Sequence, residues 1–280
     1  MFVAALVAVA CLWEFYKVIG PDKGGKVFGW TVLPRAGDRS MPHVWEMFAR
    51  LGDVEASQGG RHIWQIIASS IWYSLRLVVA GFALGITVGM GLGVVMSRLK
   101  LVERGLMPLL VASQTVPLIA LAPLVVAWGG KLHIGSFTWE KWMSAVVLGA
   151  FLSFFPVAIG TLKGLNSPPT EALELMQSYA ATWRQTLVKL RFPAAVPFLI
   201  PALKLAGSAS VFGVLVSEIS TGVSGGVGRL IIKFANEASS KPARVFTSVF
   251  GAVILGLVMA GLVAAAESRI MRNRPKEIPV

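Results

Sequence analysis

The sequence predicts an all-α membrane protein with one domain, residues 1–280, and six transmembrane helices. Hydrophobic residues make up 55% of the chain and charged residues only 14%, whereas a soluble domain carries about 25% charged residues. Apolar segments of about 20 residues, the length that crosses a bilayer as a helix, recur along the whole chain. This recurrence excludes a signal peptide or a single membrane anchor. The predicted spans are about 2–19, 68–96, 106–128, 143–162, 197–221 and 246–266.

The first span is the weakest because it carries Glu14 and Lys17 and begins one residue after Met1. Either the natural chain starts upstream of Met1, or it begins almost inside the membrane. In the connection 20–67, the stretch MPHVWEMFARL (41–51) predicts a short interfacial helix. Proline lies near its start, and it offers aromatic and apolar side chains to the lipid boundary, namely Trp45, Met47 and Phe48.

Basic residues set the predicted orientation, because short basic connections mark the cytoplasmic face. The loop 97–105 and the C-terminal tail are both basic, so both termini, 97–105 and 163–196 are expected inside. The connection 20–67 is then outside despite its basic residues, since long loops translocate with less regard to charge. The basic residues concerned are Arg98, Lys100, Arg104, Arg269, Arg272, Arg274 and Lys276.

Several functions are disfavoured by composition. The formal charge of +12 is spread among connections, which fits anionic lipid better than nucleic acid. The only cysteine, Cys11, allows no internal disulfide, and three scattered histidines (His43, His62 and His133) give no metal-ligand spacing. No phosphate-binding GxxxxGK[ST] loop and no nucleophile–base pair is present, so no enzyme activity and no cofactor are expected in this chain.

Two charges inside predicted spans need partners. By helix rise, Arg76 and Glu218 lie roughly 5–12 Å below the outer boundary. Charges at that depth are costly unless they are paired or face water. We predict that the two side chains pair near an outer gate; the alternative is that each extends separately to the headgroups.

Small and polar residues suggest two further features. Gly81, Gly85, Gly89 and Gly93 form a stripe for close helix packing or, alternatively, for lining a solute path, and Gly91 is off this stripe. Pro117 and Pro123 interrupt the third span. Polar side chains beside that break and on the fifth span are candidates for a solute path. The alternative is that their hydroxyl groups form hydrogen bonds only within their own helix. The candidates are Gln114, Thr115, Ser217, Ser220 and Thr221. The glycine-rich segment 222–244, with Arg229, is either a partner contact at the outer mouth or an ordinary loop.

The cytoplasmic stretch EALELMQSYAATWRQTLVKLRFPAA (171–195) predicts a helix with Ser167 as its N-cap and Pro168 at its first position. A bend follows at Ala180–Ala181, and a second helix is expected to end before Pro193. Its spacing resembles the EAA loop of bacterial ATP-binding-cassette importer permeases, which has E-A-A, three residues, G, nine residues and I-x-L-P. Glu174 and Pro193 agree with that pattern, whereas Ala180 replaces the glycine.

Other stretches resemble the permeases of sulfonate, taurine, nitrate and pyrimidine-precursor importers. They are IASSIWYSLRLVVAGFALGITVGMGLG (67–93), SQTVPLIALAPLVVAWGG (113–130), FFPVAIGTLKGL (154–165) and LVSEISTGVSGGVGRLI (215–231). The resemblance implies a type I importer (MetI-like) permease fold in a prokaryotic inner membrane. It also implies two ATPase partners that bind ATP and Mg, an extracytoplasmic solute-binding protein, and a second permease that is either identical or paralogous.

On this resemblance, the loop 167–193 is the coupling loop that transmits ATPase closure to the spans. Trp183 is either an anchor in that contact or a lipid anchor. An ion-coupled secondary transporter is the alternative function, although neither a midplane relay nor an internal repeat is visible. The residues expected to serve in coupling are Glu171, Glu174, Ala180, Trp183, Arg184 and Pro193.

Overall fold

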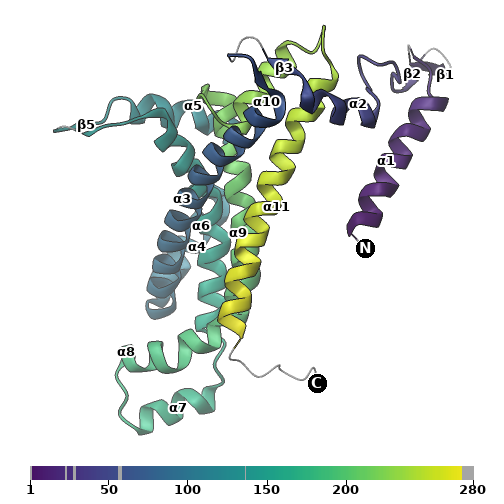
Figure 1. Cartoon of the computed structure of the whole chain (residues 1–280). Coiled ribbons are helices and arrows are strands. Elements are labelled where there is room, and N and C mark those ends of the chain that lie inside the picture. Colours follow the sequence, from purple (N-terminus) through teal and green to yellow (C-terminus); the bar gives the residue numbers. More distant parts are fainter. Residues whose placement is uncertain (1, 23, 28–29, 56–58, 136, 273–280) are drawn as a thin grey trace. The chain divides into compact units, whose positions relative to one another are not determined.

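The computed structural model describes residues 2–22, 24–27, 30–55, 59–135 and 137–272. The chain is mostly helical and forms two compact units (Figure 1). The first unit comprises Met1–Tyr73 and Ser224–Ile254, and the second comprises Ser74–Val223 and Leu255–Val280. Two long helices, α3 (Ile63–Arg98) and α11 (Ala243–Met271), contribute residues to both units.

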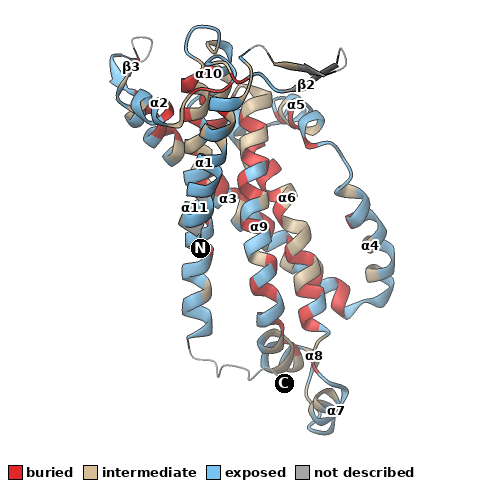
Figure 2. Ribbon diagram, turned by 90° about the vertical axis from the view of Figure 1, so that its right-hand side faces the viewer, coloured by how far each residue is buried: buried red, intermediate tan, exposed pale blue. Residues whose placement is uncertain are grey.

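The second unit is centred on α6 (Lys141–Leu165) and α9 (Phe192–Thr221), which lie side by side with most of the buried residues between them (Figure 2). Helix α5 (Leu118–Gly129) packs on this pair through Leu118, Ala122 and Leu148. The remaining elements are α4 (Lys100–Ser113), the two-stranded hairpin β5–β6 (His133–Ile134 and Phe137–Thr138), α7 (Thr170–Ser178), α8 (Trp183–Thr186) and the π-helical turn η3 (Leu187–Arg191).

The glycine stripe of α3 lies against α6. All four glycines are buried, and a methyl group at Gly89 would come within 2.5 Å of the Phe154 carbonyl oxygen. At Gly85 it would collide with the Ser153 hydroxyl, and at Gly81 and Gly93 with atoms of α6 as well. Gly91 is exposed, with nothing within 4 Å of such a methyl group. The stripe therefore lets the two helices approach closely, which is the packing role predicted for it.

Gly89→Ala is expected to destabilise the protein by about 1–3 kcal/mol, because the contacted atom belongs to the α6 backbone and cannot move aside. Gly91→Ala is the matched control and is expected to be neutral or to stabilise by about 0.5–1 kcal/mol through helix propensity. Thermal unfolding of both variants in detergent measures the difference. Equal behaviour of the two variants would contradict the packing role.

The predicted spans correspond unequally to the helices observed. Four helical stretches are long and apolar enough to cross a membrane: α3, α6, the stretch Trp183–Thr221 and α11. The range 106–128 is not one straight helix, since α4 and α5 are bent by 103° relative to each other. The predicted interruption of the third span is present at Pro117, which disfavours helical backbone at the residue before it and is the N-cap of a new helix. That the two helices together form one span stays a prediction.

The first unit combines short elements with the ends of the long helices. Ile63, Ile66 and Ile67 of α3 pack against Leu230 and Phe234 of α10 to form its core. Its other elements are α1 (Phe2–Ile19), the antiparallel hairpin β1–β2 (Gly25–Val27 and Trp30–Leu33), α2 (Val44–Ala49), η1 (Arg50–Gly52), the antiparallel pair β3–β4 (Val54–Glu55 and Arg61–His62) and α10 (Val227–Asn236).

The charges that weakened the first predicted span are satisfied by the segment 38–44. Glu14 Oε1 accepts a hydrogen bond from the Val44 backbone at 2.6 Å, and His43 Nδ1 is 2.8 Å from Glu14 Oε2. Lys17 Nζ donates to Asp38 Oδ1 at 2.6 Å and to the Met41 carbonyl. This hydrogen bond and the Lys17 charge lower the pKa of Asp38. Glu14 and Lys17 therefore anchor α1 to the chain that follows it.

The predicted interfacial helix is present as α2, although it begins at Val44, after Pro42 rather than at it. Trp45 and Phe48 are exposed as expected. Met47 is buried instead, and its carbonyl accepts a hydrogen bond from the Thr247 hydroxyl at 2.7 Å. The prediction of Met47 as a lipid contact is wrong because that side of α2 packs against α11, where Phe48 also stacks on Phe250.

A buried ionic network joins β3 to the start of α11. Arg244 is 3% exposed and donates to Glu55 Oε2 at 2.6 Å and to Asp53 Oδ2 at 3.1 and 3.3 Å. Lys233 Nζ lies 3.5 Å from the other Glu55 oxygen. Because about 190 residues of chain separate Arg244 from its carboxylates, no local sequence pattern indicates this network.

Candidate functional site

The predicted coupling loop forms a helical hairpin beyond the ends of α6 and α9 (Figure 1). Helix α7 begins at Thr170 with Pro169 as its N-cap, so the prediction of Ser167 as the cap is wrong. The Ser167 hydroxyl instead donates to the Gly164 carbonyl at 2.7 Å, at the end of α6. Glu171 lies in the first turn of α7, where a carboxylate interacts favourably with the helix dipole.

Helix α7 ends in a Schellman motif. The Ala181 backbone donates to the Met176 carbonyl at 3.0 Å, and the Ala180 backbone donates to the Gln177 carbonyl at 2.8 Å. This motif requires left-handed backbone at the residue after the cap, and Ala180 has φ 50°. Among the described non-glycine residues, Ala180 alone has a positive φ. The position where the importer pattern has glycine is therefore one that glycine suits, and alanine occupies it under strain.

Ala180→Gly is expected to stabilise the hairpin by about 0.5–1 kcal/mol. The substitution removes the strain of left-handed backbone at alanine, and this gain exceeds the loss caused by the greater conformational entropy of glycine in the unfolded chain. The measurement is hydrogen exchange of the amides in the last turn of α7, with protection expected to rise about two- to fivefold. Ala181→Gly is the control, because Ala181 has ordinary backbone and should only lose stability. Lower protection in Ala180→Gly would show that the alanine is unstrained.

Helix α8 starts with a capping box, in which the Thr182 backbone donates to Gln185 Oε1 at 2.7 Å and the Gln185 backbone donates to the Thr182 hydroxyl. It then continues through η3 into α9 as one helical stretch, Trp183–Thr221. The prediction that the helix ends before Pro193 is wrong. Proline in the first turn of α9 follows a π-helical turn, whose wider backbone accommodates the missing amide and the proline ring.

Trp183 packs within its own chain. It lies against a core cluster that includes Leu165, Leu187 and Ala195, and the Arg98 guanidinium lies 4.6 Å from the centre of its ring. This cation–π contact joins α8 to the end of α3. Arg184, the next residue, is exposed. Trp183 thus packs the hairpin against the helices of the second unit. This contact differs from both predicted roles, an anchor in a partner contact and a lipid anchor.

Helix α7 has no buried residue: Ala172, Leu173 and Met176 are half-buried and its other residues are exposed (Figure 2). Leu175 and Tyr179 are 56% and 77% exposed and, being four residues apart, share one face of the helix. Glu171 and Glu174 are also exposed on this helix. Neither Leu175 nor Tyr179 is among the predicted coupling residues, although their i, i+4 spacing places both on one face of the predicted helix.

The two predicted intramembrane charges lie in different environments. Glu218 of α9 is fully buried, and its Oε1 accepts a hydrogen bond from the Ser74 hydroxyl at 2.7 Å. Arg76 of α3 is exposed. Their pairing near an outer gate stays a prediction.

The candidate solute-path residues fall into two groups. Gln114 and Thr115 are exposed at the bend between α4 and α5, where the Thr115 hydroxyl donates to the Ala112 carbonyl. Ser217, Ser220 and Thr221 lie on the last turns of α9. In the described part of the chain the buried hydroxyls of Ser217 and Ser220 have no hydrogen-bond partner, whereas Thr221 donates to the Ser217 carbonyl at 2.7 Å. The cluster around Leu118 contains Val216, so α5 begins near this part of α9.

Comparison with known proteins agrees with this arrangement. Residues 81–272 match the family described as binding-protein-dependent transport system inner membrane component. The chain is 32% identical over 208 residues to the formylaminopyrimidine transport permease protein ThiX of Halalkalibacterium halodurans, covering 73% of this chain and 77% of that one. It is 26% identical over 272 residues to the putative aliphatic sulfonates transport permease protein SsuC of Bacillus subtilis, covering 92% and 93%.

A solved structure supports the fold. The MetNI methionine ABC transporter in an inward-facing conformation contains a chain that aligns with a TM-score of 0.59 at 19% identity, covering 74% of this chain and 95% of that one. The sequence resemblance to importer permeases is thus confirmed by the family match and by curated relatives. The chain belongs to the family of binding-protein-dependent transport system inner membrane components.

Proposed function

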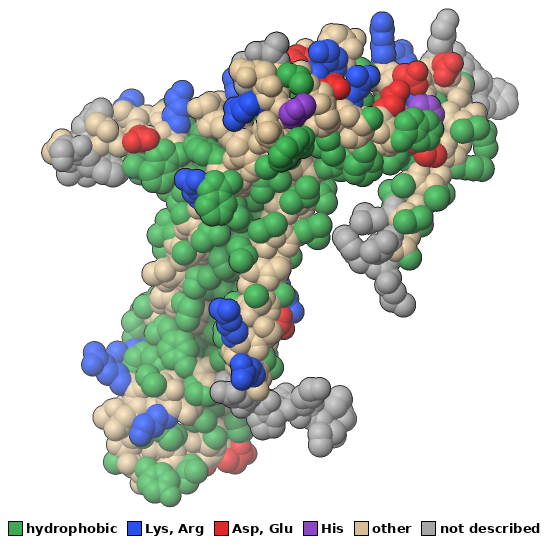
Figure 3. All heavy atoms as spheres, viewed as in Figure 1, with side chains coloured by type: hydrophobic (Ala, Val, Ile, Leu, Met, Phe, Trp, Pro, Cys, Tyr) green, Lys and Arg blue, Asp and Glu red, His purple; other side chains and the backbone are tan. Residues whose placement is uncertain are grey.

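We propose that this chain is the permease subunit of an ATP-driven importer and that the α7–α8 hairpin couples it to two partner ATPase subunits. The observation that carries the proposal is helix α7, which has no buried residue and presents the exposed side chains of Leu175 and Tyr179 beside acidic groups. An exposed apolar pair on a short helix that projects from a bundle is suited to insertion into a groove on another protein. Hydrophobic and charged side chains gather together at this end of the second unit (Figure 3).

The attachment of the hairpin is suited to transmitting force. On one side α8 is continuous with α9 through η3, so movement of α8 moves a long apolar helix. On the other side, the contact of Arg98 with Trp183 connects α8 to α3. At the junction, Arg191 Nη1 donates to the Leu165 carbonyl at the end of α6 at 3.1 Å. Three helices of the unit therefore receive any displacement of the hairpin directly.

The proposed cycle is alternating access between two conformations. A loaded binding protein docks on the extracytoplasmic face, and ATP-driven closure of the ATPases draws the hairpins of two permeases together. The second permease is either a copy of this chain or a paralogue. Relatives named for formylaminopyrimidine and for aliphatic sulfonates support a small polar or anionic solute. The polar residues at the α4–α5 bend and at the end of α9 are our candidates for the solute path.

Reconstitution tests the proposal. The chain is co-expressed with its ATPase and its binding protein, purified, and incorporated into proteoliposomes. We expect a stable complex with the ATPase and solute uptake that requires both ATP and the binding protein. Uptake by the permease alone, driven by an ion gradient, would support a secondary transporter and contradict the proposal.

A further inference from the structure

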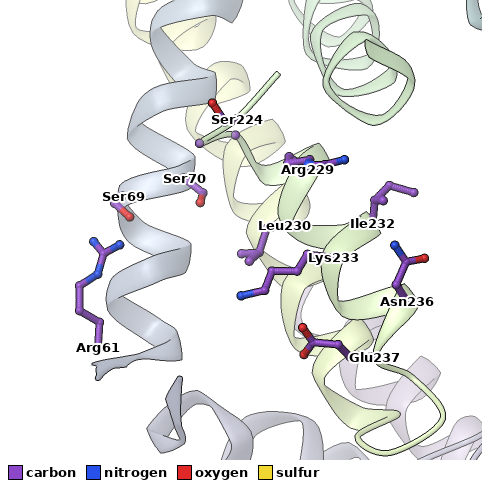
Figure 4. A pocket seen from close by; sticks show the side chains of 12 residues that line it. Arg61, Ser69, Ser70, Ser224, Arg229, Leu230, Ile232, Lys233, Asn236 and Glu237 are labelled. Carbon is purple, nitrogen blue, oxygen red and sulfur yellow. The ribbon is translucent and has the colours of Figure 1, made fainter. Parts of the chain in front are cut away.

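A polar pocket of about 500 Å³ lies in the first unit, between the start of α3 and helix α10 (Figure 4). Its wall comes from β4, from two consecutive serines of α3, from the glycine-rich segment before α10, and from one side of α10. The volume is within the range of small-ligand sites, roughly 300–1,000 Å³. The family match begins at residue 81 and therefore does not include the α3 and β4 part of this wall.

The charged residues of the wall are mostly basic. Arg61, Arg229 and Lys233 line the pocket, and Glu237 is the only acidic residue among the described residues that do so. In Figure 4 the Lys233 ammonium extends from α10 toward α3, and Arg61 lies on the α3 side. Basic residues that border one concave surface from two elements create a positive potential that attracts small anions.

Ser70 supplies a second and independent indication of a ligand. It is 5% exposed, it lines the pocket, and its hydroxyl points toward α10 in Figure 4. Within the described residues this hydroxyl has no hydrogen-bond partner, whereas the neighbouring Ser69 donates to the Ile66 carbonyl at 2.8 Å. The Ser70 oxygen is not among the fully buried side-chain atoms that lack a partner in the described residues, so it is accessible from the pocket. A ligand that accepts a hydrogen bond in the pocket would satisfy Ser70.

The basic wall is held in position by the buried ionic network. Lys233 Nζ is 3.5 Å from Glu55 Oε1, and the other oxygen of Glu55 binds Arg244 at 2.6 Å. Glu55 therefore holds Lys233 at the edge of the pocket while its other oxygen is fixed by Arg244. A cation fixed before the ligand arrives loses little conformational entropy on binding, which favours affinity.

We propose that this pocket binds an oxyanion group of the carboxylate or sulfonate type. The basic side chains would neutralise its charge, and Ser70 would donate a hydrogen bond to one of its oxygens. Such a group comes either from a free small solute or from an acidic side chain of a docked protein. The proposal goes beyond the coupling role of the hairpin and does not depend on it, since binding to the purified chain needs no ATPase.

The test is calorimetric titration of the purified full-length chain in detergent with methanesulfonate. Dimethyl sulfone, an uncharged molecule of similar shape, is the ligand control. We expect saturable binding of methanesulfonate alone. The dissociation constant should rise at least tenfold in Arg61→Gln and in Arg229→Gln, and about three- to tenfold in Ser70→Ala. Arg39→Gln is the matched control, because Arg39 is exposed in the same unit outside the pocket.

A second arm separates the two sources of the oxyanion by measuring the affinity of the chain for the importer's binding protein. If methanesulfonate binds and does not displace that protein, the source is a free solute. If the protein alone binds, and Arg229→Gln and Ser70→Ala weaken it while Arg39→Gln does not, the source is an acidic side chain. The proposal is overturned if neither ligand depends on Arg229 and Ser70, or if dimethyl sulfone binds as well as methanesulfonate.

Discussion

The double substitution Leu175→Asp with Tyr179→Asp is expected to abolish ATP-dependent uptake while leaving the helices of the chain folded. Both side chains are exposed on α7, so no internal packing is lost when they change. Large apolar and aromatic residues at the centre of an interface often contribute 2 kcal/mol or more each, about 30-fold in affinity. Two new carboxylates in an apolar groove would weaken binding further, because burying a charge without a partner costs free energy.

The measurement is the affinity of the purified permease for its ATPase, together with uptake in proteoliposomes. Gln177→Asp is the matched control, since Gln177 is exposed on the same helix and its side chain points about 200° around the axis from Leu175. We expect affinity to fall at least 30-fold in the double variant and less than threefold in the control. Equal losses in both would indicate a general effect of negative charge on α7 rather than a docking face.

Arg244→Met is expected to give the largest loss of stability, about 3–5 kcal/mol, because it leaves Asp53 and Glu55 without their buried cation. The Glu55 side chain is only 10% exposed, so water cannot readily replace the guanidinium. Lys233, at 3.5 Å from Glu55, and Arg50, at 3.6 Å from Asp53, are both partly exposed and each contacts only one carboxylate, so they replace Arg244 only in part. The measurement is hydrogen exchange of the α10 amides, in which a 3 kcal/mol loss corresponds to about 150-fold faster opening.

Neutralising the carboxylates provides the control. In the triple variant Arg244→Met, Asp53→Asn and Glu55→Gln, most of the lost protection should return, since no buried charge then remains unpaired. Arg229→Gln, which removes an exposed arginine of the same unit, should change protection by less than threefold. A failure of the triple variant to recover would show that Arg244 acts through the packing of its aliphatic stem instead.

Much of the helical framework was predictable, because apolar runs and a glycine stripe are local patterns. The four glycines of α3 repeat every four residues, and this period alone placed them on one face that packs against α6. The loop 167–193 was predicted as two helices on either side of a bend at Ala180–Ala181. Helices α7 and α8 do lie on either side of that bend, although the second helix continues past Pro193. Glu14 and Lys17 were recognisable from the sequence as unusual charges in an apolar helix. Their partners in segment 38–44 explain why the helix tolerates them.

Other features depend on tertiary structure or on backbone geometry that residue types do not specify. A proline pattern indicates an interruption, but not that α4 and α5 diverge by 103°. Pro193 suggested a helix end, whereas the π-helical turn before it allows the helix to continue. The contact of Arg98 with Trp183 joins residues that are far apart in sequence, and so does the Arg244 network. No periodicity within one element contains that information.

The central claim, that α7 docks on a partner ATPase, is tested most directly by photocrosslinking. A benzophenone amino acid replaces Tyr179 in the chain expressed with its ATPase and binding protein in native membranes, and another copy carries it at Gln177. We expect illumination to yield an adduct of the permease with the ATPase from position 179, and much less from position 177. Adducts with lipid alone at position 179, in membranes that retain ATP-dependent uptake, would contradict it.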